Sequence, residues 1–154
     1  MSDTAPGQRP DLPTSLSSRL GFMLQRAASD AGRLATTKLH PLGIDPRHHA
    51  VLALIVELGP LSQQDLADLL HVDRSTMVAL IDDLESRRYV RRQRSPHDRR
   101  AYAIHPTVAG KTAQTRAAKL LQQCERSYLA ALTGDEQDLL YELLARLIST
   151  NPAD

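Results

Sequence analysis

The stretch from Leu61 to Pro106 decides the fold: LSQQDLADLLHVDRSTMVALIDDLESRRYVRRQRSPHDRRAYAIHP. Its first half predicts two short helices, because apolar residues recur at three- and four-residue steps. Ser62 can cap the first helix and Asp73 the second, which is predicted over Arg74 to Arg88, with a turn between the two helices. The residues of the second helix that we expect to face inward are Met77, Val78, Ile81 and Leu84.

The second half of the stretch changes to the alternating pattern of a β-strand. Tyr89 to Arg94 predicts one strand, Ser95 to Asp98 a turn, and Arg99 to His105 the partner strand. Two helices in quick succession followed by an arginine-bearing hairpin are the winged helix-turn-helix arrangement. The second helix of such a unit can present side chains to base edges in a major groove, while the hairpin reaches the adjacent minor groove.

The charge of this stretch is segregated along the chain. The whole sequence has a net charge of +1, from 19 basic and 18 acidic residues, which by itself is no sign of a nucleic-acid partner. Residues 61–86, however, carry six acids and one arginine, whereas residues 87–100 carry seven arginines and one aspartate. The positive charge therefore gathers at the end of the second helix and in the hairpin, where it favours contact with DNA.

Long amphipathic stretches lie before this unit. An apolar stripe predicts a helix from Leu16 to Leu39, ended by Pro41 and Gly43. Asp45-Pro46 then has the pattern of a helix start, and the segment 47–58 that follows is apolar nearly all round, which predicts a buried helix.

Two further helices are predicted after the hairpin, one capped by Thr107 and one opened by the capping box Thr133-Gly134-Asp135-Glu136. The stripe 139–148 of the last helix and the stripe 16–39 expose more apolar surface than one protomer of this size can cover, so we expect a homodimer. The predicted fold is mainly α with a small β wing. The predicted organisation is a flexible N-terminal arm over 1–13, dimerisation helices over 14–44 and 107–150, and a winged helix-turn-helix over 45–106.

Composition excludes several other classes of protein. Hydrophobic residues make up 42% and charged residues 24%, as in an ordinary globular protein, and the longest apolar run, 50–56, is far too short to span a membrane. No secretory leader is visible, so the expected location is the cytoplasm. A single cysteine, Cys124, rules out a disulfide framework, and we expect it to be a buried thiol. No phosphate-binding loop, HExxH motif or nucleophile elbow is present, so neither catalysis nor a cofactor is expected.

His48-His49 is the one histidine pair in the chain. Adjacent helical residues diverge by about 100°, so the two rings cannot chelate one ion from a single helix, and no pair of histidines four residues apart exists. We therefore expect no metal site, whereas one of the two could line a pocket for a small molecule.

Five segments carry a resemblance to the multiple-antibiotic-resistance regulator (MarR) family: LSQQDLA (61–67), VDRSTM (72–77), LESRRYVRR (84–92), DRR (98–100) and TVAG (107–110). The resemblance extends over nearly the whole chain, since the flanking helices have the expected order and lengths, and its most specific part runs from Arg91 to Gly110. It implies a homodimeric transcription factor whose terminal helices interleave across a two-fold axis. Each winged unit would then read one half of a pseudo-palindromic operator, and many members lose DNA affinity when a small aromatic or phenolic ligand binds between the two regions.

The resemblance also implies roles for individual residues. Ser75 and Thr76, helped by Arg74, would contact phosphate or base edges at the start of the second helix. Asp98 would brace the wing arginines, and Arg100 would enter the minor groove, with Arg99 as a neighbouring candidate for that role. The further residues that we expect at the DNA interface are Ala79, Arg94 and Arg99, and those that we expect at an effector pocket are His48, His49 and Met23.

Two positions depart from the family pattern. Ala79 stands where members commonly have arginine, and Asp83 stands where they have a basic residue. Base readout would then depend on Arg74 and on a contact between Ala79 and a thymine methyl group. The acidic pair Asp82 and Asp83 also leaves open a second interpretation, a winged-helix module that binds proteins instead of DNA.

Overall fold

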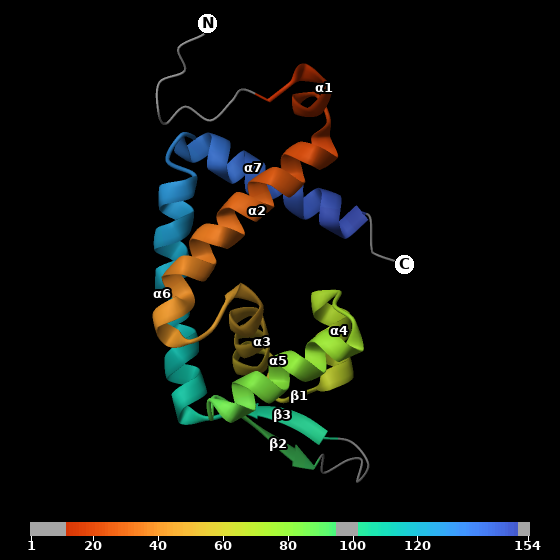
Figure 1. The fold of residues 1–154 in the computed structure, drawn as a ribbon, viewed down its shortest axis with the longest axis vertical. Coiled ribbons are helices and arrows are strands. Elements are labelled where there is room, and N and C mark those ends of the chain that lie inside the picture. Colours follow the sequence, from red (N-terminus) through yellow and green to blue (C-terminus); the bar gives the residue numbers. More distant parts are fainter. Residues whose placement is uncertain (1–11, 95–101, 151–154) are drawn as a thin grey trace, which may run out of the picture.

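The structure is a computed structural model that describes residues 12–94 and 102–150 (Figure 1). Its helices are connected by short turns and accompany one small antiparallel sheet, so the predicted class, mainly α with a β wing, is confirmed. The elements are α1 (Thr14–Ser17), α2 (Leu20–Leu39), the 3-10 helix η1 (His40–Leu42), α3 (Pro46–Glu57), β1 (Leu61–Ser62), α4 (Gln63–Leu70), α5 (Arg74–Ser86), β2 (Val90–Arg94), β3 (Tyr102–Pro106), α6 (Val108–Tyr128) and α7 (Gly134–Thr150).

The sheet contains the predicted hairpin and one additional strand. Strands β2 and β3 pair antiparallel, with Val90 opposite Pro106 and Arg94 opposite Tyr102. The two-residue strand β1 pairs with the other edge of β3 through Leu61 and Ile104, so the strand order is β1-β3-β2. The sequence analysis did not predict β1, which lies immediately before the first helix of the helix-turn-helix.

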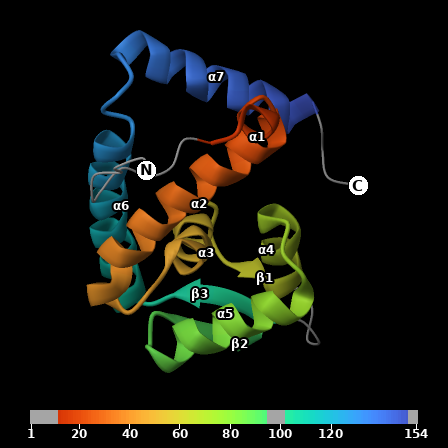
Figure 2. The ribbon, with the colours of Figure 1, turned by 45° about the horizontal axis from the view of Figure 1, so that its top comes forward.

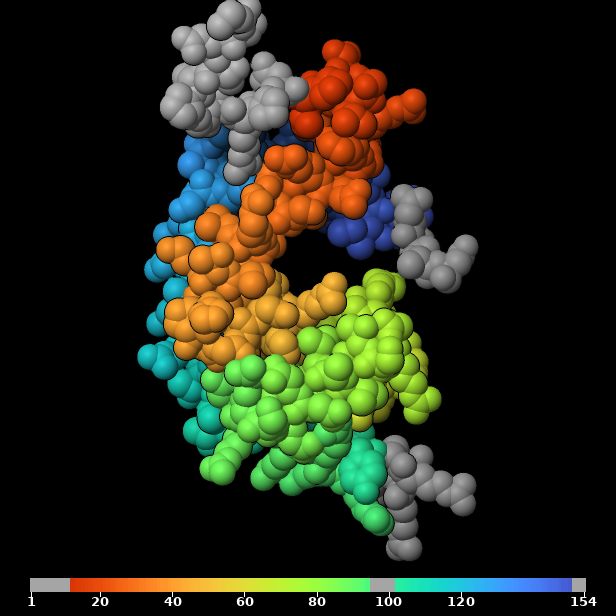
Figure 3. All heavy atoms as spheres, viewed as in Figure 1, coloured from red at the N-terminus to blue at the C-terminus, as the bar shows by residue number. Residues whose placement is uncertain are grey.

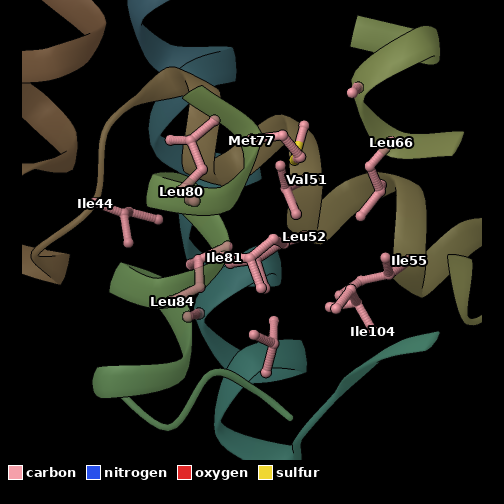
Figure 4. Packing of buried hydrophobic residues seen from close by; sticks show 14 of the residues in the cluster. Ile44, Val51, Leu52, Ile55, Leu66, Met77, Leu80, Ile81, Leu84 and Ile104 are labelled. Carbon is pink, nitrogen blue, oxygen red and sulfur yellow. The ribbon is translucent and has the colours of Figure 1, made fainter. Parts of the chain in front are cut away.

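The core lies between α3, α4, α5, the sheet and the first half of α6 (Figure 4). In α5 the buried residues follow one stripe at the spacing i, i+3, i+4, i+7, namely Met77, Leu80, Ile81 and Leu84. The prediction that Val78 faces inward was wrong. It is 38% exposed, because it points about 100° away from Met77, and Leu80 takes its place.

The predicted helix caps are confirmed. The side-chain oxygens of the cap residues accept first-turn backbone N–H groups, which have no partner within their own helices. The donor–acceptor distances are 2.8 Å from Arg47 N to Asp45, 3.1 Å from Asp65 N to Ser62, 2.9 Å from Thr76 N to Asp73, 3.0 Å from Gly110 N to Thr107 and 3.4 Å from Glu136 N to Thr133.

The terminal helices form the other end of the molecule (Figures 1 and 2). Helix α2 packs along α6, and α7 crosses beside α2 at the far end. The helix predicted from Leu16 to Leu39 is divided in two, because Arg19 adopts an extended conformation after the consecutive serines 17 and 18, which are weak helix formers. Helix α7 has no buried residue, and its side chain Ile148 is 73% exposed.

The space-filling view shows a wide opening between these two ends of the molecule (Figure 3). It lies between α7 and the N-terminal part of α2 on one side and the winged unit, here defined as residues 45–106, on the other, while the C-terminal end of α2 contacts α3. Two segments of the chain connect the terminal helices to the winged unit: η1, which follows α2, and α6, which follows β3.

Candidate nucleic-acid interface

The start of α5 is organised around the carboxylate of Asp73. The hydroxyls of Ser75 and Thr76 both donate to this carboxylate, the latter at 2.5 Å, and the backbone N–H of Thr76 donates at 2.9 Å. These hydrogen bonds, that from Ser75 first, hold the pKa of Asp73 well below its usual range. In the free protein both hydroxyl hydrogens are thus engaged by Asp73, and the hydroxyls must exchange this partner before they donate to a phosphate.

Several predicted contact residues do come together on the outer surface of the winged unit. Arg74, Ser75 and Ala79 are exposed on α5, and Thr76 is half-buried beside them. Arg94 is exposed at the end of β2, where the wing begins. The remaining predicted residues, Asp98, Arg99 and Arg100, lie outside the described residues.

Arg92 does not belong to the exposed face of the wing. Its side chain is only 23% exposed and forms ion pairs with Glu85 and, at 2.5 Å, with Asp82, both on α5. Its backbone N–H donates to the Glu85 carboxylate at 3.0 Å. Burial alone would lower the pKa of Arg92, but the hydrogen bonds that it donates to the carboxylates of Asp82 and Glu85 outweigh burial and raise the pKa. Arg92 therefore holds β2 against α5 through these contacts.

The acidic pair on α5 is engaged within the chain. Asp82 binds Arg92, and the Oδ2 atom of Asp83 lies 3.0 Å from Arg87 Nε and 3.1 Å from His48 Nε2. The charge segregation seen along the sequence is thus partly cancelled in space. The observation that favoured a protein-binding module has an intramolecular explanation.

An apolar cavity of about 530 Å³ lies between α2, α6 and α7. Small side chains spaced along α2, such as Ala27, Ala31 and Ala35, leave room for it. The lining residues with polar side chains are Cys124, Glu125, Tyr128 and Tyr141, and the Tyr128 hydroxyl is already donating to the Ala27 carbonyl at 3.0 Å. The described residues that line the cavity include no lysine, arginine or histidine. As predicted, Cys124 is buried.

None of the three predicted effector residues is among those that line this cavity. Met23 is 40% exposed on α2, next to the lining residue Leu24. His48 lies between two carboxylates and is only 12% exposed. His49 lines a separate cleft of about 410 Å³ together with Lys119 and Glu125. Burial lowers the pKa of His49, and its Nε2 atom is buried without a hydrogen-bond partner.

Within residues 12–94 and 102–150, no group of three or more histidine, cysteine, aspartate or glutamate side chains could hold a metal ion. Over the same residues, no helix is both long and apolar enough to cross a membrane.

A helix-turn-helix with an exposed second helix, followed by a hairpin with exposed arginines, defines a winged-helix DNA-binding protein. The chain belongs to the MarR family of transcriptional regulators: the model of the MarR family matches residues 42–101. A relative from Thauera aromatica, named for transcriptional regulation of the hcr operon, is 34% identical over 134 residues, which cover 86% of this chain and 81% of the relative. The chain is accordingly a regulator of transcription and not an enzyme.

Solved structures of the family include one bound to DNA and one bound to a ligand. A mutant MarR from E. coli in complex with operator DNA has a TM-score of 0.77 and 26% identity, covering 84% of this chain and 93% of that one. CouR from Rhodococcus jostii RHA1 bound to p-coumaroyl-CoA has a TM-score of 0.79 and 26% identity, covering 92% of this chain and 98% of that one.

Proposed function

We propose that the protein is a homodimeric, sequence-specific DNA-binding repressor that is released from its operator by a small-molecule effector. The observation that carries the proposal is the exposed start of α5 beside the arginine-bearing strand β2, in a fold shared with a regulator crystallised on its operator. Such a repressor works in the cytoplasm.

In this proposal α5 lies in a major groove with Arg74, Ser75 and Thr76 at its N-terminus and Ala79 one turn further on. The N-terminal end of a helix favours phosphate because its backbone N–H groups point outward there. Arg94 and Arg99 contact the DNA backbone, while Asp98 orients Arg100 in the minor groove. The substitution Arg100→Ala then weakens operator binding by about 1–3 kcal/mol.

The dimer is proposed because the terminal helices leave apolar side chains uncovered. Leu139 is 53%, Tyr141 54% and Ile148 73% exposed on α7. A second copy that covers this face places two winged units on one side of the dimer, related by a two-fold axis. The operator is then pseudo-palindromic, with the centres of its half-sites about one helical turn apart.

The effector is proposed to bind in the cavity between α2, α6 and α7. A volume of about 530 Å³ accommodates a small aromatic molecule, and the lining is almost entirely apolar. A free carboxylate would meet no cation among the described lining residues, which include the acidic residue Glu125. We therefore propose an effector whose buried end is aromatic and uncharged, such as a phenol or the acyl end of a thioester. CouR, which binds p-coumaroyl-CoA, is a neighbour with this fold.

The experiment is a selection of random DNA duplexes by the purified protein, followed by release assays. Enrichment of a pseudo-palindromic sequence supports the proposal, and no enrichment of any sequence contradicts it. Release is then tested with benzoate and with its methyl ester, a matched pair that differs in charge. The ester is expected to release the operator at lower concentration. The variant Ala31→Phe, which fills the cavity, is expected to keep operator binding and lose the response.

A further inference from the structure

The side chain of His48 connects two elements of the winged unit. It is the third residue of α3, and its Nε2 atom lies 3.1 Å from Asp83 Oδ2 in the second half of α5. At the other end of the ring, Nδ1 lies 3.3 Å from the backbone N of Asp45 and 2.9 Å from that residue's Oδ1 atom. The ring therefore lies between the two carboxylates, with Nε2 as the nitrogen that can offer a hydrogen to Asp83.

Asp83 lies on the same face of α5 as the residues proposed to read DNA. Ser75, Ala79 and Asp83 follow one another at intervals of four residues, so they form one row along the helix. An unpaired carboxylate at the end of this row would repel the phosphates of DNA. His48 and Arg87 both bind the same Oδ2 atom, and they hold this carboxylate in place.

A second anchor holds the same helix from another direction. Asp82, the preceding residue, points about 100° away around the helix and binds Arg92 of β2. Helix α5 is therefore held towards the wing by Asp82 and towards the start of α3 by Asp83. Two attachments in different directions limit rotation of the helix about its own axis. That rotation decides where Arg74, Ser75 and Ala79 point.

The segment that holds His48 is itself tied to the C-terminal end of α5. The hydroxyl of Tyr89 donates to the carbonyl of Leu42 at 3.1 Å. Gly43 has a φ of +67°, and a Cβ atom there would collide with the guanidinium of Arg87. From the opposite side, the carbonyl of Tyr89 accepts from the backbone N–H of Thr107 at 3.0 Å. The turn after α5 is thus enclosed by the connections to α2 and α6.

We propose that His48 is a positioning residue for operator recognition: by bridging Asp45 and Asp83, it fixes the rotation of α5 and keeps the Asp83 carboxylate away from the DNA phosphates. This inference rests on the proposed DNA-binding function.

The test uses two substitutions that leave the helix cap intact. Glu and Gln at the third helical position both accept from the cap residue's N–H, so His48→Glu and His48→Gln retain the capping box of α3. Glutamate removes the donor to Asp83 and adds a like charge, whereas the glutamine amide still offers one. The two variants and the wild type are compared in thermal unfolding, and in binding to the selected operator and to a scrambled duplex.

We expect His48→Glu to weaken operator binding about tenfold and His48→Gln to weaken it by less than about threefold, with unfolding temperatures within a few degrees of wild type. The loss of affinity should be larger for the operator than for the scrambled duplex, because the wing arginines that bind any duplex are unchanged. In an Asp83→Asn background the same His48→Glu substitution should cost less than about threefold, since its repulsion partner is gone.

The proposal is overturned if His48→Glu binds the operator as wild type does, or if its loss is as large in the Asp83→Asn background. An equal loss on both duplexes together with a lowered unfolding temperature indicates a merely structural role and also overturns it. If His48→Glu does not fold, His48→Asn, which is too short to reach Asp83, replaces it in the same cycle. A protein that prefers no duplex at all contradicts the proposed function instead.

Discussion

The winged unit and the terminal helices differ in how completely they bury their apolar side chains. The core cluster lies in the winged unit, in Ile44 just before it, at the end of α2 and in the first half of α6, and Leu39, Leu52 and Ile81 are 0% exposed. No residue of 12–34 or 125–150 is buried. The first region can therefore hold its fold within one chain, whereas the second has apolar faces that only another surface can cover.

The largest effect should come from a cavity made inside the winged unit. Leu52→Ala removes a fully buried side chain of α3 and should lower the free energy of unfolding by about 2–5 kcal/mol. The matched change in the other region, Leu147→Ala, removes a side chain that is 46% exposed in one protomer. Its cost should arise through the dimer.

Thermal unfolding at several protein concentrations distinguishes these two substitutions. The shift from Leu52→Ala should be nearly independent of protomer concentration, while that from Leu147→Ala should shrink as the protein is diluted, because the weakened interface is then no longer formed in either protein. If the shifts in unfolding temperature of both variants depended on protein concentration in the same way, the terminal helices would need no partner.

The second prediction places a charge on the uncovered face of α7. Ile148→Glu should give monomers, because a carboxylate would be buried without a partner in the dimer interface. Operator affinity should fall by about 100-fold or more, since a single winged unit loses the effective concentration supplied by its twin. Analytical ultracentrifugation and gel-shift titration measure the two results. The control Ser149→Glu adds the same charge next to it, at a polar exposed residue.

A dimeric Ile148→Glu protein with unchanged operator binding would contradict the proposal that a second copy covers α7. A monomer that still unfolds cooperatively would show that the winged unit holds its fold without a second copy.

The third prediction separates two arginines of one strand. Arg94→Ala should weaken operator binding about three- to tenfold and reduce the slope of log K against log salt by about 1, because one phosphate contact is lost. Arg92→Ala should remove the ion pairs with Asp82 and Glu85 and lower the free energy of unfolding by about 1–2 kcal/mol. Gel-shift titration at several salt concentrations and urea unfolding check both. If Arg92→Ala instead weakened operator binding and Arg94→Ala lowered the free energy of unfolding, Arg92 would be the arginine that contacts DNA.

The contrast between these arginines also marks the limit of what the sequence could predict. Alternation along 89–94 predicts a strand, and caps such as Asp73 and Thr107 have local signals that place helix starts correctly. The partners of Arg92 and His48 lie in other elements, so spacing along the chain carries no sign of them. Strand β1 was missed for the same reason, since two residues have no period and their partner lies about 40 residues away. The cavity depends on how α2, α6 and α7 cross, which is tertiary geometry.

The smallest effects concern one helix cap in each region, Asp73 at α5 and Glu136 at α7. Hydrogen bonds lower the pKa of both carboxyls, from the Ser75 and Thr76 hydroxyls in the first case, and from the backbone N–H and then the hydroxyl of Thr133 in the second. A carboxyl whose pKa is lowered by folding stabilises the protein above its unfolded pKa, about 4. This stabilisation is lost as the pH falls towards the folded pKa.

Asp73→Asn and Glu136→Gln should both make stability fall less steeply than in the wild type between about pH 5 and pH 3, because each removes one group that takes up a proton on acid unfolding. The effects of the two variants on stability should differ in how they depend on protein concentration. Asp73→Asn alters the unfolding of the winged unit at every protein concentration, while Glu136→Gln acts on a helix that the dimer completes and should therefore depend on dilution. Thermal unfolding across this pH range at two concentrations measures both, with Asp138→Asn, a carboxyl outside either cap, as the control. If dilution changed the two variants alike, the caps would belong to one cooperative unit, and the distinction between a self-sufficient region and one completed by a second copy would fail.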